Sequence, residues 1–296
     1  HLSMLMIDKG NLIKSKKNIN KAIKIAKKEQ YMRNAAKYLD CLGIILRQER
    51  KFTDSIKVVN EALLISKLTN DQHGMRKYLN SIGLVEERKG NFNAALKIYI
   101  DCLEISRKIG ERRSAAVSCN NAAGMYSALG DKKNAIKFYK KAFLIAKRIN
   151  YKQGMAAYSF NIASTYYEQE NLSKCLTFLL NSEALFKEMS DLFHNEVEIF
   201  LCYIYLKKED IKNLNKFFKK IKSIDSNNNL SAARNWEIYQ IRQAFNKSKT
   251  NEDFLIQAKD KLNKELLIMN SKKGKKMFIE NFMHNANIVD EELQYN

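Results

Sequence analysis

Cysteine and histidine are the residues of this chain that could bind a metal or perform redox chemistry. The five cysteines are odd in number and include no C-x-x-C pair; they are Cys41, Cys102, Cys119, Cys175 and Cys202. The four histidines are far apart, and none belongs to an H-E-x-x-H motif. Zinc sites draw their ligands from closely spaced cysteines and histidines, so this spacing predicts no metal site. We expect free, buried thiols in a reducing compartment, the cytoplasm.

Motifs for phosphate binding and for nucleophilic catalysis are also missing from the sequence. It contains no G-x-x-x-x-G-K-[ST] loop, no G-x-G-x-x-G loop and no G-x-S-x-G elbow. The carboxylate pairs Glu86-Glu87 and Glu291-Glu292 fall on segments with helical periodicity. A catalytic pair needs a pocket that shifts its pKa values, whereas carboxylates on helices are ordinarily solvated. The sequence therefore predicts a protein that is not an enzyme and needs no cofactor.

The charge balance limits the class of partner. The 296 residues include 52 lysines and arginines against 32 aspartates and glutamates, which gives a net charge of +20. Such a balance favours acidic proteins, nucleic acid or anionic membrane surfaces as partners. The alternative is compositional bias, since most lysines are interspersed along amphipathic segments. No apolar run reaches eighteen residues, so no membrane span is expected.

The elements that must position these residues are predicted to be helices. The chain has no proline and only 10 glycines, which excludes collagen-like and turn-rich all-β classes. Apolar residues recur at three- and four-residue steps, as in amphipathic helices. This pattern predicts helices over 115–129 and 133–149, with Gly130 ending the first one as a C-cap residue.

A shift of 40 residues aligns the chain with itself. Three columns of small residues recur at this spacing: Gly43, Gly83, Ala123 and Ala163; Ser55, Ala95, Ala135 and Cys175; Ala62, Cys102, Ala142 and Ser182. The hexapeptide at 22–27, AIKIAK, returns as ALLISK, CLEISR and AFLIAK. Such a period is typical of stacked helix pairs, in which small side chains let the helices approach closely. We interpret Cys102 and Cys175 as substitutes for alanine in these columns.

These columns resemble the tetratricopeptide repeat (TPR), in the 40-residue variety of kinesin light chains, Pins-like proteins and bacterial peptide-sensing regulators. The small residues match the family's eighth, twentieth and twenty-seventh repeat positions, and Tyr126, Tyr166, Tyr99 and Tyr139 match its aromatic positions. The family's proline late in helix B is absent. The resemblance implies an all-α superhelical solenoid of about seven antiparallel helix pairs, A and B, with a C-terminal capping helix.

The repeat register divides the chain into three segments. Residues 1–190 are predicted to form regular 40-residue repeats, and residues 191–270 degenerate helical repeats. Ser3 falls in the middle of a helix A, so the first repeat is expected to be truncated on its N-terminal side, with further repeats before it. Residues 271–296 are expected to form the capping helix, because a solenoid needs a polar final element and four lysines open this segment.

The resemblance also places a binding groove along the A helices. In TPR proteins the second, fifth, ninth, twelfth and thirteenth positions of helix A face the groove. With neighbouring asparagines, these give Lys37, Asp40, Arg47, Lys77, Asn80, Arg88, Asn120, Asn121, Ser127, Asn161, Ser164 and Tyr167. A carboxamide both donates and accepts hydrogen bonds, so an asparagine ladder suits an extended peptide backbone. The alternative is that the asparagines only reflect the chain's general excess of Asn.

Three functions remain open at this point. The first is a scaffold that binds an extended acidic peptide or partner segment, as a regulatory or sensory part of a larger signalling protein. The second is a receptor for a short intracellular signalling peptide, and the third is a nucleic-acid-binding helical repeat protein. Positive charge on the concave face of the folded chain would favour a peptide, a convex or edge stripe would favour nucleic acid, and an even spread would favour bias.

Overall fold

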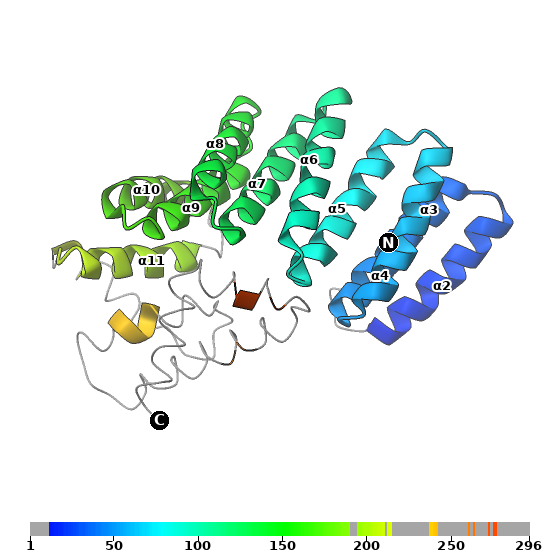
Figure 1. The fold of residues 1–296 in the computed structure, drawn as a ribbon, viewed down its shortest axis with the longest axis horizontal. Coiled ribbons are helices and arrows are strands. Elements are labelled where there is room, and N and C mark those ends of the chain that lie inside the picture. Colours follow the sequence, from blue (N-terminus) through cyan, green and yellow to red (C-terminus); the bar gives the residue numbers. More distant parts are fainter. Residues whose placement is uncertain are drawn as a thin grey trace. The chain divides into compact units, whose positions relative to one another are not determined.

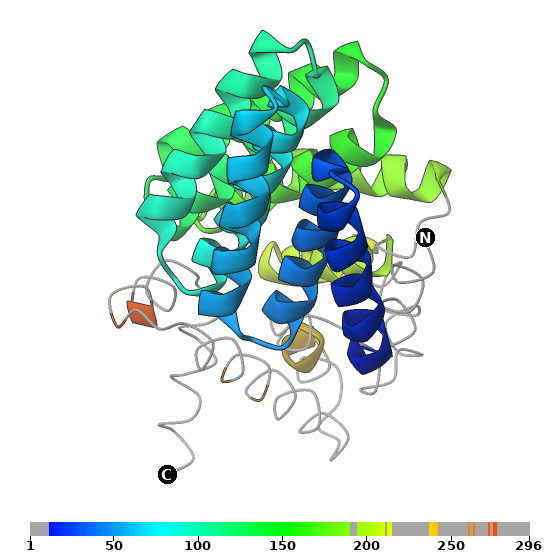
Figure 2. The same cartoon turned by 90° about the vertical axis from the view of Figure 1, so that its right-hand side faces the viewer.

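The computed structural model describes residues 12–189, 194–210, 212–214 and 237–241, together with residues 260, 263, 272, 275 and 276. Every regular element within these residues is an α-helix, and the ten long ones are α2 to α11 (Figures 1 and 2). The all-α prediction is therefore confirmed, with helices that follow one another in packed pairs. The predicted capping helix and the greater part of the degenerate repeats lie outside the described residues.

The helices alternate between the two types that the repeat predicts. The A helices are α3 (Met32–Gln48), α5 (Gln72–Arg88), α7 (Arg112–Ala128), α9 (Lys152–Tyr167) and α11 (His194–Lys207). The B helices are α2 (Leu12–Lys28), α4 (Phe52–Leu68), α6 (Phe92–Lys108), α8 (Lys132–Arg148) and α10 (Leu172–Glu188). Most have 17 residues, because the repeat of 40 is divided into two equal helices and two equal turns.

The same turn ends nearly every helix. A residue with positive φ recurs every 20 positions: Gln30, Arg50, Asn70, Gly90, Gly110, Gly130, Asn150 and Glu170. In the first turn the amide of Tyr31 donates to the carbonyl of Ala26 at 2.8 Å, and that of Gln30 donates to Lys27 at 3.2 Å. This is the Schellman pattern, which satisfies the last carbonyls of a helix. Glycine marks only three of these eight turns, at 90, 110 and 130, so the other five turns carry little sequence signal.

The small-residue columns lie where A and B helices approach each other. Ala62, Ala95, Cys102, Ala135 and Ala142 are all fully buried. A Cβ atom added to Gly83 would lie 2.7 Å from Cε1 of Tyr99, whose ring is itself buried. Ser55 uses the same proximity, since its hydroxyl donates to the carbonyl of Gly43 at 2.7 Å. Close packing of this kind leaves no room for a larger side chain.

The chain divides into two compact units, His1–Met125 and Tyr126–Asn296, with the boundary inside α7. We call them the N-terminal unit and the C-terminal unit. The core of the N-terminal unit runs from α2 to α5 and includes Ile19, Ile45 and Tyr78. The core of the C-terminal unit includes Ile162, Leu179 and Phe200 from α9, α10 and α11.

No helix of the described part is long and apolar enough to cross a membrane. The described residues also contain no group of three or more His, Cys, Asp or Glu side chains that could hold a metal ion. All five cysteines are free and buried. Burial raises the pKa of the Cys102 and Cys202 thiols to about 12, which keeps them protonated and unreactive at neutral pH.

Candidate functional site

The first cluster of predicted site residues joins α3 to α5. The carboxylate of Asp40 is completely buried and lies 3.0 Å from the ammonium group of Lys77. It also accepts a hydrogen bond of 2.6 Å from the hydroxyl of Ser81. A buried carboxylate requires partners of this kind. Asp40 and Lys77 therefore bind each other across the two helices, while the Lys77 side chain stays about half exposed at 47%.

A second cluster consists of three asparagines on α5 and α7. The Asn121 carboxamide donates to Oδ1 of Asn80 at 3.2 Å, and the Asn120 carboxamide donates to Oδ1 of Asn121 at 3.3 Å. All three side chains are partly buried. Each carboxamide offers two donors and one oxygen acceptor, so these two bonds do not exhaust the network's capacity. Three of the four asparagines of the predicted ladder thus form a hydrogen-bonded chain that joins α5 to α7, and their role in peptide binding stays a prediction.

Two arginines form a third cluster near the C-terminal ends of α3 and α5. Burial lowers the pKa of Arg47, and the neighbouring positive charge of Arg88 lowers it further. Neither guanidinium group has a carboxylate within 4.0 Å among the described residues. The Arg88 charge acts on Arg47 and neither group has a close carboxylate, so this end of the two helices is a candidate site for an anionic group.

The nearest acidic group of this third cluster is Glu87, which sequence analysis set aside as a surface carboxylate. Its Oε2 atom accepts a hydrogen bond of 2.8 Å from the Tyr99 hydroxyl. Burial raises the pKa of Glu87, and this effect outweighs the opposing hydrogen bond and the two arginine charges. Glu87 is therefore buried and already hydrogen-bonded to Tyr99, and it lies beyond ion-pair distance of both arginines.

One spacing relates the contacts between successive A helices. Asp40 with Ser81, Asn80 with Asn121, and Ser127 with Glu168 are each 41 residues apart. Arg47 and Arg88 have the same separation. Residues 40 apart occupy the same position in successive repeats. Residues that contact each other across two A helices are 41 apart, one residue beyond the equivalent position. A search for complementary polar residues at 41 would have found Ser81 and Glu168, which sequence analysis missed.

The predicted site residues of the C-terminal unit have a different environment. The Ser127 hydroxyl donates to the Glu168 carboxylate at 3.4 Å, and Lys132 lies 3.9 Å from the same group. Burial raises the pKa of Glu168 to about 7 despite this lysine. Tyr167 is 5% exposed and packs against Phe200, with ring centroids 5.5 Å apart.

Three further predicted residues make fewer described contacts. The carbonyl of Asn161 accepts a bond of 2.8 Å from Thr165, while its own side chain is partly exposed. Ser164 is also partly exposed, and Lys37 is fully exposed. The polar clusters of the N-terminal unit therefore make the stronger candidate site.

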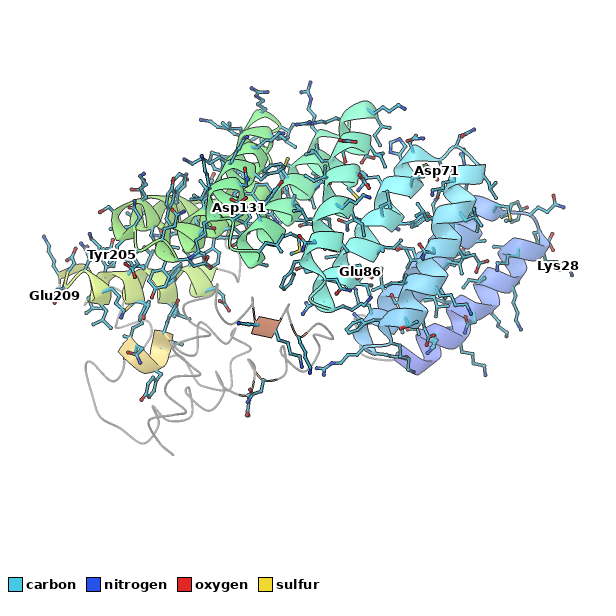
Figure 3. All side chains as sticks on the ribbon, viewed as in Figure 1. Lys28, Asp71, Glu86, Asp131, Tyr205 and Glu209 are labelled. Carbon is cyan, nitrogen blue, oxygen red and sulfur yellow. The ribbon has the colours of Figure 1, made fainter. Side chains whose placement is uncertain are left out.

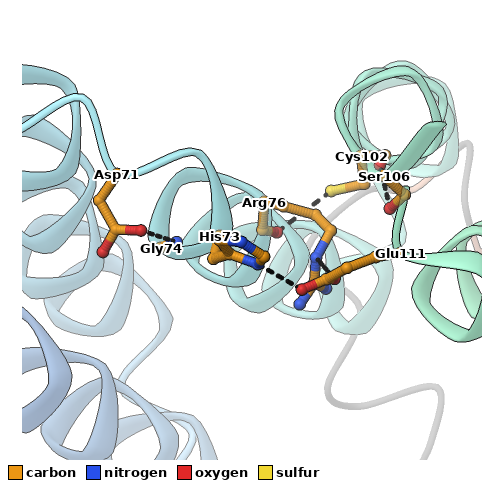
Figure 4. Close-up of polar contacts among 7 residues, drawn as sticks. All are labelled: Asp71, His73, Gly74, Arg76, Cys102, Ser106 and Glu111. Atoms are coloured by element: carbon orange, nitrogen blue, oxygen red, sulfur yellow. Dashed lines mark hydrogen bonds and ion pairs between the residues drawn. The ribbon is translucent and has the colours of Figure 1, made fainter. Parts of the chain in front are cut away.

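A fourth polar cluster, which the sequence did not suggest, joins the N-terminal half of α5 to the turn before α7 (Figure 4). Nε of Arg76 lies 2.8 Å from the Glu111 carboxylate, and His73 contacts its other oxygen. Burial tends to raise the pKa of Glu111, but hydrogen bonds from Ser114 and His73 and the Arg76 charge lower it overall. Unlike Arg88, Arg76 therefore has a carboxylate within ion-pair distance. Figure 3 labels Asp71 and Glu86 near the two ends of α5. The fourth cluster lies toward the Asp71 end of this helix, and Arg88 lies toward the Glu86 end.

Positive charge is distributed unevenly over the described helices. Two B helices, α2 and α8, each contain seven lysines and arginines and no acidic residue. The B helices α4 and α10 each contain two basic and two acidic residues. Compositional bias alone would spread the lysines more evenly over the helices. The net positive charge of α2 and α8 therefore sets these two helices apart from α4 and α10.

Two protein-family models match the sequence. The tetratricopeptide repeat model matches residues 74–148, and the model described as Root UVB sensitive protein, C-terminal, matches residues 5–98. No curated protein matches the chain in sequence.

Solved structures resemble the fold closely. One is a signal transduction ATPase with numerous domains (STAND) from Pyrococcus horikoshii, which has a tetratricopeptide repeat sensor. It aligns with a TM-score of 0.69 and 18% identity, and the alignment covers 94% of this chain and 43% of that one. The apo quorum sensor NprR from B. thuringiensis aligns with a TM-score of 0.64 and 16% identity, covering 98% and 85%. A Rap protein complexed with competence and sporulation factor aligns with a TM-score of 0.58 and 14% identity, covering 90% and 77%. At these identities the comparison establishes a shared fold, and the chain spans less than half of the STAND protein.

Proposed function

Because the chain is built from tetratricopeptide repeats, we propose that it is a non-catalytic scaffold whose A helices bind an extended, acidic segment of a peptide or protein partner. It would act as a regulatory or sensory part of a larger signalling protein. The reducing cytoplasm is the compartment that suits its five free, buried thiols.

The arginine pair of the N-terminal unit is the observation that carries this proposal. Arg47 is partly desolvated beside Arg88, and neither has a close carboxylate among the described residues. A carboxylate from a ligand would supply the missing counterion and accept paired hydrogen bonds from the planar guanidinium groups. An acidic partner is therefore favoured over a neutral or basic one.

The other two polar clusters suit the rest of an extended ligand. On α5, the half-exposed Lys77 and Arg88 are eleven residues apart, which is about three helical turns and roughly 16 Å along one face. An extended segment advances about 3.3 Å per residue, so about five ligand residues span this distance. The carboxamides of Asn80 and Asn121, which lie between α5 and α7, could then bind the ligand backbone.

The structural neighbours support a sensory role without identifying the ligand. A quorum sensor, a tetratricopeptide repeat sensor and a Rap protein complexed with competence and sporulation factor share this fold. A receptor for a short intracellular signalling peptide is therefore the second candidate. It would be distinguished from a scaffold by compaction on binding, measured as a decrease in radius of gyration by small-angle X-ray scattering.

The proposal is tested by calorimetry with unstructured acidic peptides and the Arg47→Ala, Arg88→Ala double variant. We expect micromolar affinity, because ordering a flexible peptide offsets much of the contact energy. The double variant should lose about 10–100-fold in affinity, since it removes charge-assisted hydrogen bonds. Binding of the wild type should also weaken as salt rises.

A matched control removes two exposed cations from a B helix, with Lys97→Ala and Arg107→Ala on α6. This control should bind the peptide as the wild type does. Equal losses in both double variants would mean that only net charge matters, and would remove the A-helix site from the account.

A further inference from the structure

The exposed face of α8 in the C-terminal unit carries a single sign of charge. Its exposed residues are Lys133, Lys137, Lys140, Leu144, Lys147 and Arg148. Their spacing of three or four residues places them along one side of the helix, over roughly 22 Å. We call this row of five cations and one leucine the α8 stripe.

Among the described residues, no side chain of the α8 stripe forms an ion pair within 4.0 Å, and Asp131, just before the helix, is an acidic group that acts on Lys133. The helix itself contains no aspartate or glutamate. The ion pairs described in the C-terminal unit join Lys132 to Glu168 and Lys152 to Glu188, and neither involves a residue of the stripe. Like charges at successive helical turns destabilise a helix slightly, so an anionic partner would relieve repulsion as well as supply attraction.

Apolar side chains beside these cations indicate which polyanion fits. Leu144 is 55% exposed in the middle of the stripe, and Leu180 on the neighbouring α10 is 41% exposed. The two helices are neighbours, because Nζ of Lys140 lies 5.7 Å from the ring centroid of Phe178 on α10. Lysines flanking protruding leucines are suited to a lipid interface, where the cations meet acidic headgroups and the leucines enter the acyl boundary.

The aromatic rings near the stripe argue against nucleic acid. Proteins that bind single strands offer open aromatic faces on which bases stack. Here Lys140 lies over the rings of both Tyr166 and Phe178, and Lys141 lies 5.4 Å from the ring centroid of Phe138. Tyr166 and Phe178 also stack on each other, with centroids 5.7 Å apart. These rings are therefore already covered, and a nucleic acid would be left with phosphate contacts alone.

We propose that the α8 stripe binds the surface of a bilayer that contains acidic phospholipids, with Leu144 entering the interface. This surface belongs to a B helix of the C-terminal unit and is independent of the peptide site proposed on the A helices. Each lysine near an acidic bilayer strengthens partitioning by about fivefold. Reversing two of the charges should therefore weaken binding by at least about 25-fold.

The test is co-sedimentation of the full chain with phosphatidylcholine vesicles, with and without about 30% phosphatidylserine. The wild type should bind only the acidic vesicles. The Lys137→Glu, Lys147→Glu variant should lose this binding. The control variant, Lys97→Glu with Lys108→Glu on α6, makes the same change in net charge and should retain it. Circular dichroism of each variant checks that these exposed substitutions leave the fold intact.

Leu144→Ser separates a membrane from a nucleic acid, because it leaves all five cations in place. It should weaken binding to acidic vesicles several-fold and leave the retention of a single-stranded RNA unchanged. Three results would overturn the proposal: no binding to acidic vesicles, equal losses in the α8 and α6 variants, or RNA binding that depends on α8 and exceeds vesicle binding.

Discussion

The N-terminal and C-terminal units use the same helix register with different chemistry between their A helices. In the N-terminal unit, polar groups join successive A helices through Asp40 with Ser81 and Asn80 with Asn121. In the C-terminal unit, Tyr167 on α9 packs against Phe200 and Tyr203 on α11, with centroid distances of 5.5 and 6.0 Å. The C-terminal unit has a polar contact as well, between Ser127 and Glu168. The repeat thus fixes where A helices meet, and the residues at each contact decide whether it is polar or aromatic.

Truncation of Tyr167 should give the largest effect on stability. The side chain is 5% exposed, and its hydroxyl donates to that of Tyr203 at 3.4 Å. Tyr167→Ala should lower the free energy of unfolding by about 3–5 kcal/mol, through lost burial and a residual cavity. Urea unfolding followed by circular dichroism measures this loss. Ser164→Ala on the same helix serves as a control and should leave the free energy of unfolding nearly unchanged. If Tyr167→Ala also left it unchanged, Tyr167 would be a surface residue that could contact a ligand.

Overpacking at a small-residue column should have the next largest effect. Gly83→Leu directs a large side chain at the buried ring of Tyr99 and should cost about 1–3 kcal/mol in the free energy of unfolding. Ala135→Leu makes the corresponding test in the C-terminal unit, since Ala135 is fully buried. Thermal unfolding compares these variants with Ala94→Leu, which changes an exposed residue of α6. Tolerance of both buried substitutions would mean that the columns are not close helix contacts.

The sequence predicted the helical fold because its repeat is expressed in small residues that packing strictly requires. At Gly83 even an added Cβ atom would clash with Tyr99, and Cys102 is fully buried, as expected for small-residue columns. Most turns were harder to see, because residues such as Gln30 and Arg50 occupy left-handed conformations that ordinarily favour glycine. The Schellman hydrogen bonds and the packing of the flanking helices stabilise those turns without a sequence signal.

The candidate site was predictable only as a set of positions. Helix periodicity places Lys77 and Tyr167 on their helices, but the state of each side chain depends on a partner about one repeat away. Lys77 pairs with Asp40, and Tyr167 packs on Phe200, because tertiary contacts decide these environments. The arginine pair follows the same rule, since Arg47 and Arg88 meet only when α5 packs on α3.

Glu168 should make stability depend on pH. Burial raises its pKa to about 7 in the folded state, above the value of about 4.3 for an unfolded chain. The folded state therefore binds a proton more tightly, and stability should fall as pH rises from about 4.3 to about 7, with the full penalty above pH 7. Glu168→Gln should remove this penalty and stabilise the protein by about 3–4 kcal/mol at pH 8.

The comparison for Glu168 is denaturant unfolding at pH 5 and pH 8. The difference between Glu168→Gln and the wild type should be larger at pH 8 than at pH 5. Glu104→Gln changes an exposed carboxylate of α6 and should shift stability equally at both values. A wild type whose unfolding has the same pH dependence as the variant would contradict a buried, high-pKa Glu168.

The smallest predicted effect concerns the turns that both units share. Arg50 in the N-terminal unit and Glu170 in the C-terminal unit have φ of 61° and 58°. A side chain in this left-handed region costs about 1 kcal/mol relative to glycine, so Arg50→Gly and Glu170→Gly should each stabilise the protein by up to about 1 kcal/mol. Gly110→Ala should instead destabilise the protein. Gly110 has φ of 74°, and an added Cβ atom would meet no other atom, so backbone strain would be the cause of the loss. Differential scanning calorimetry should show similar shifts for Arg50→Gly and Glu170→Gly, since the two turns have the same hydrogen bonds. Opposite shifts would mean that the two units differ in their turns as well as in the chemistry between their A helices.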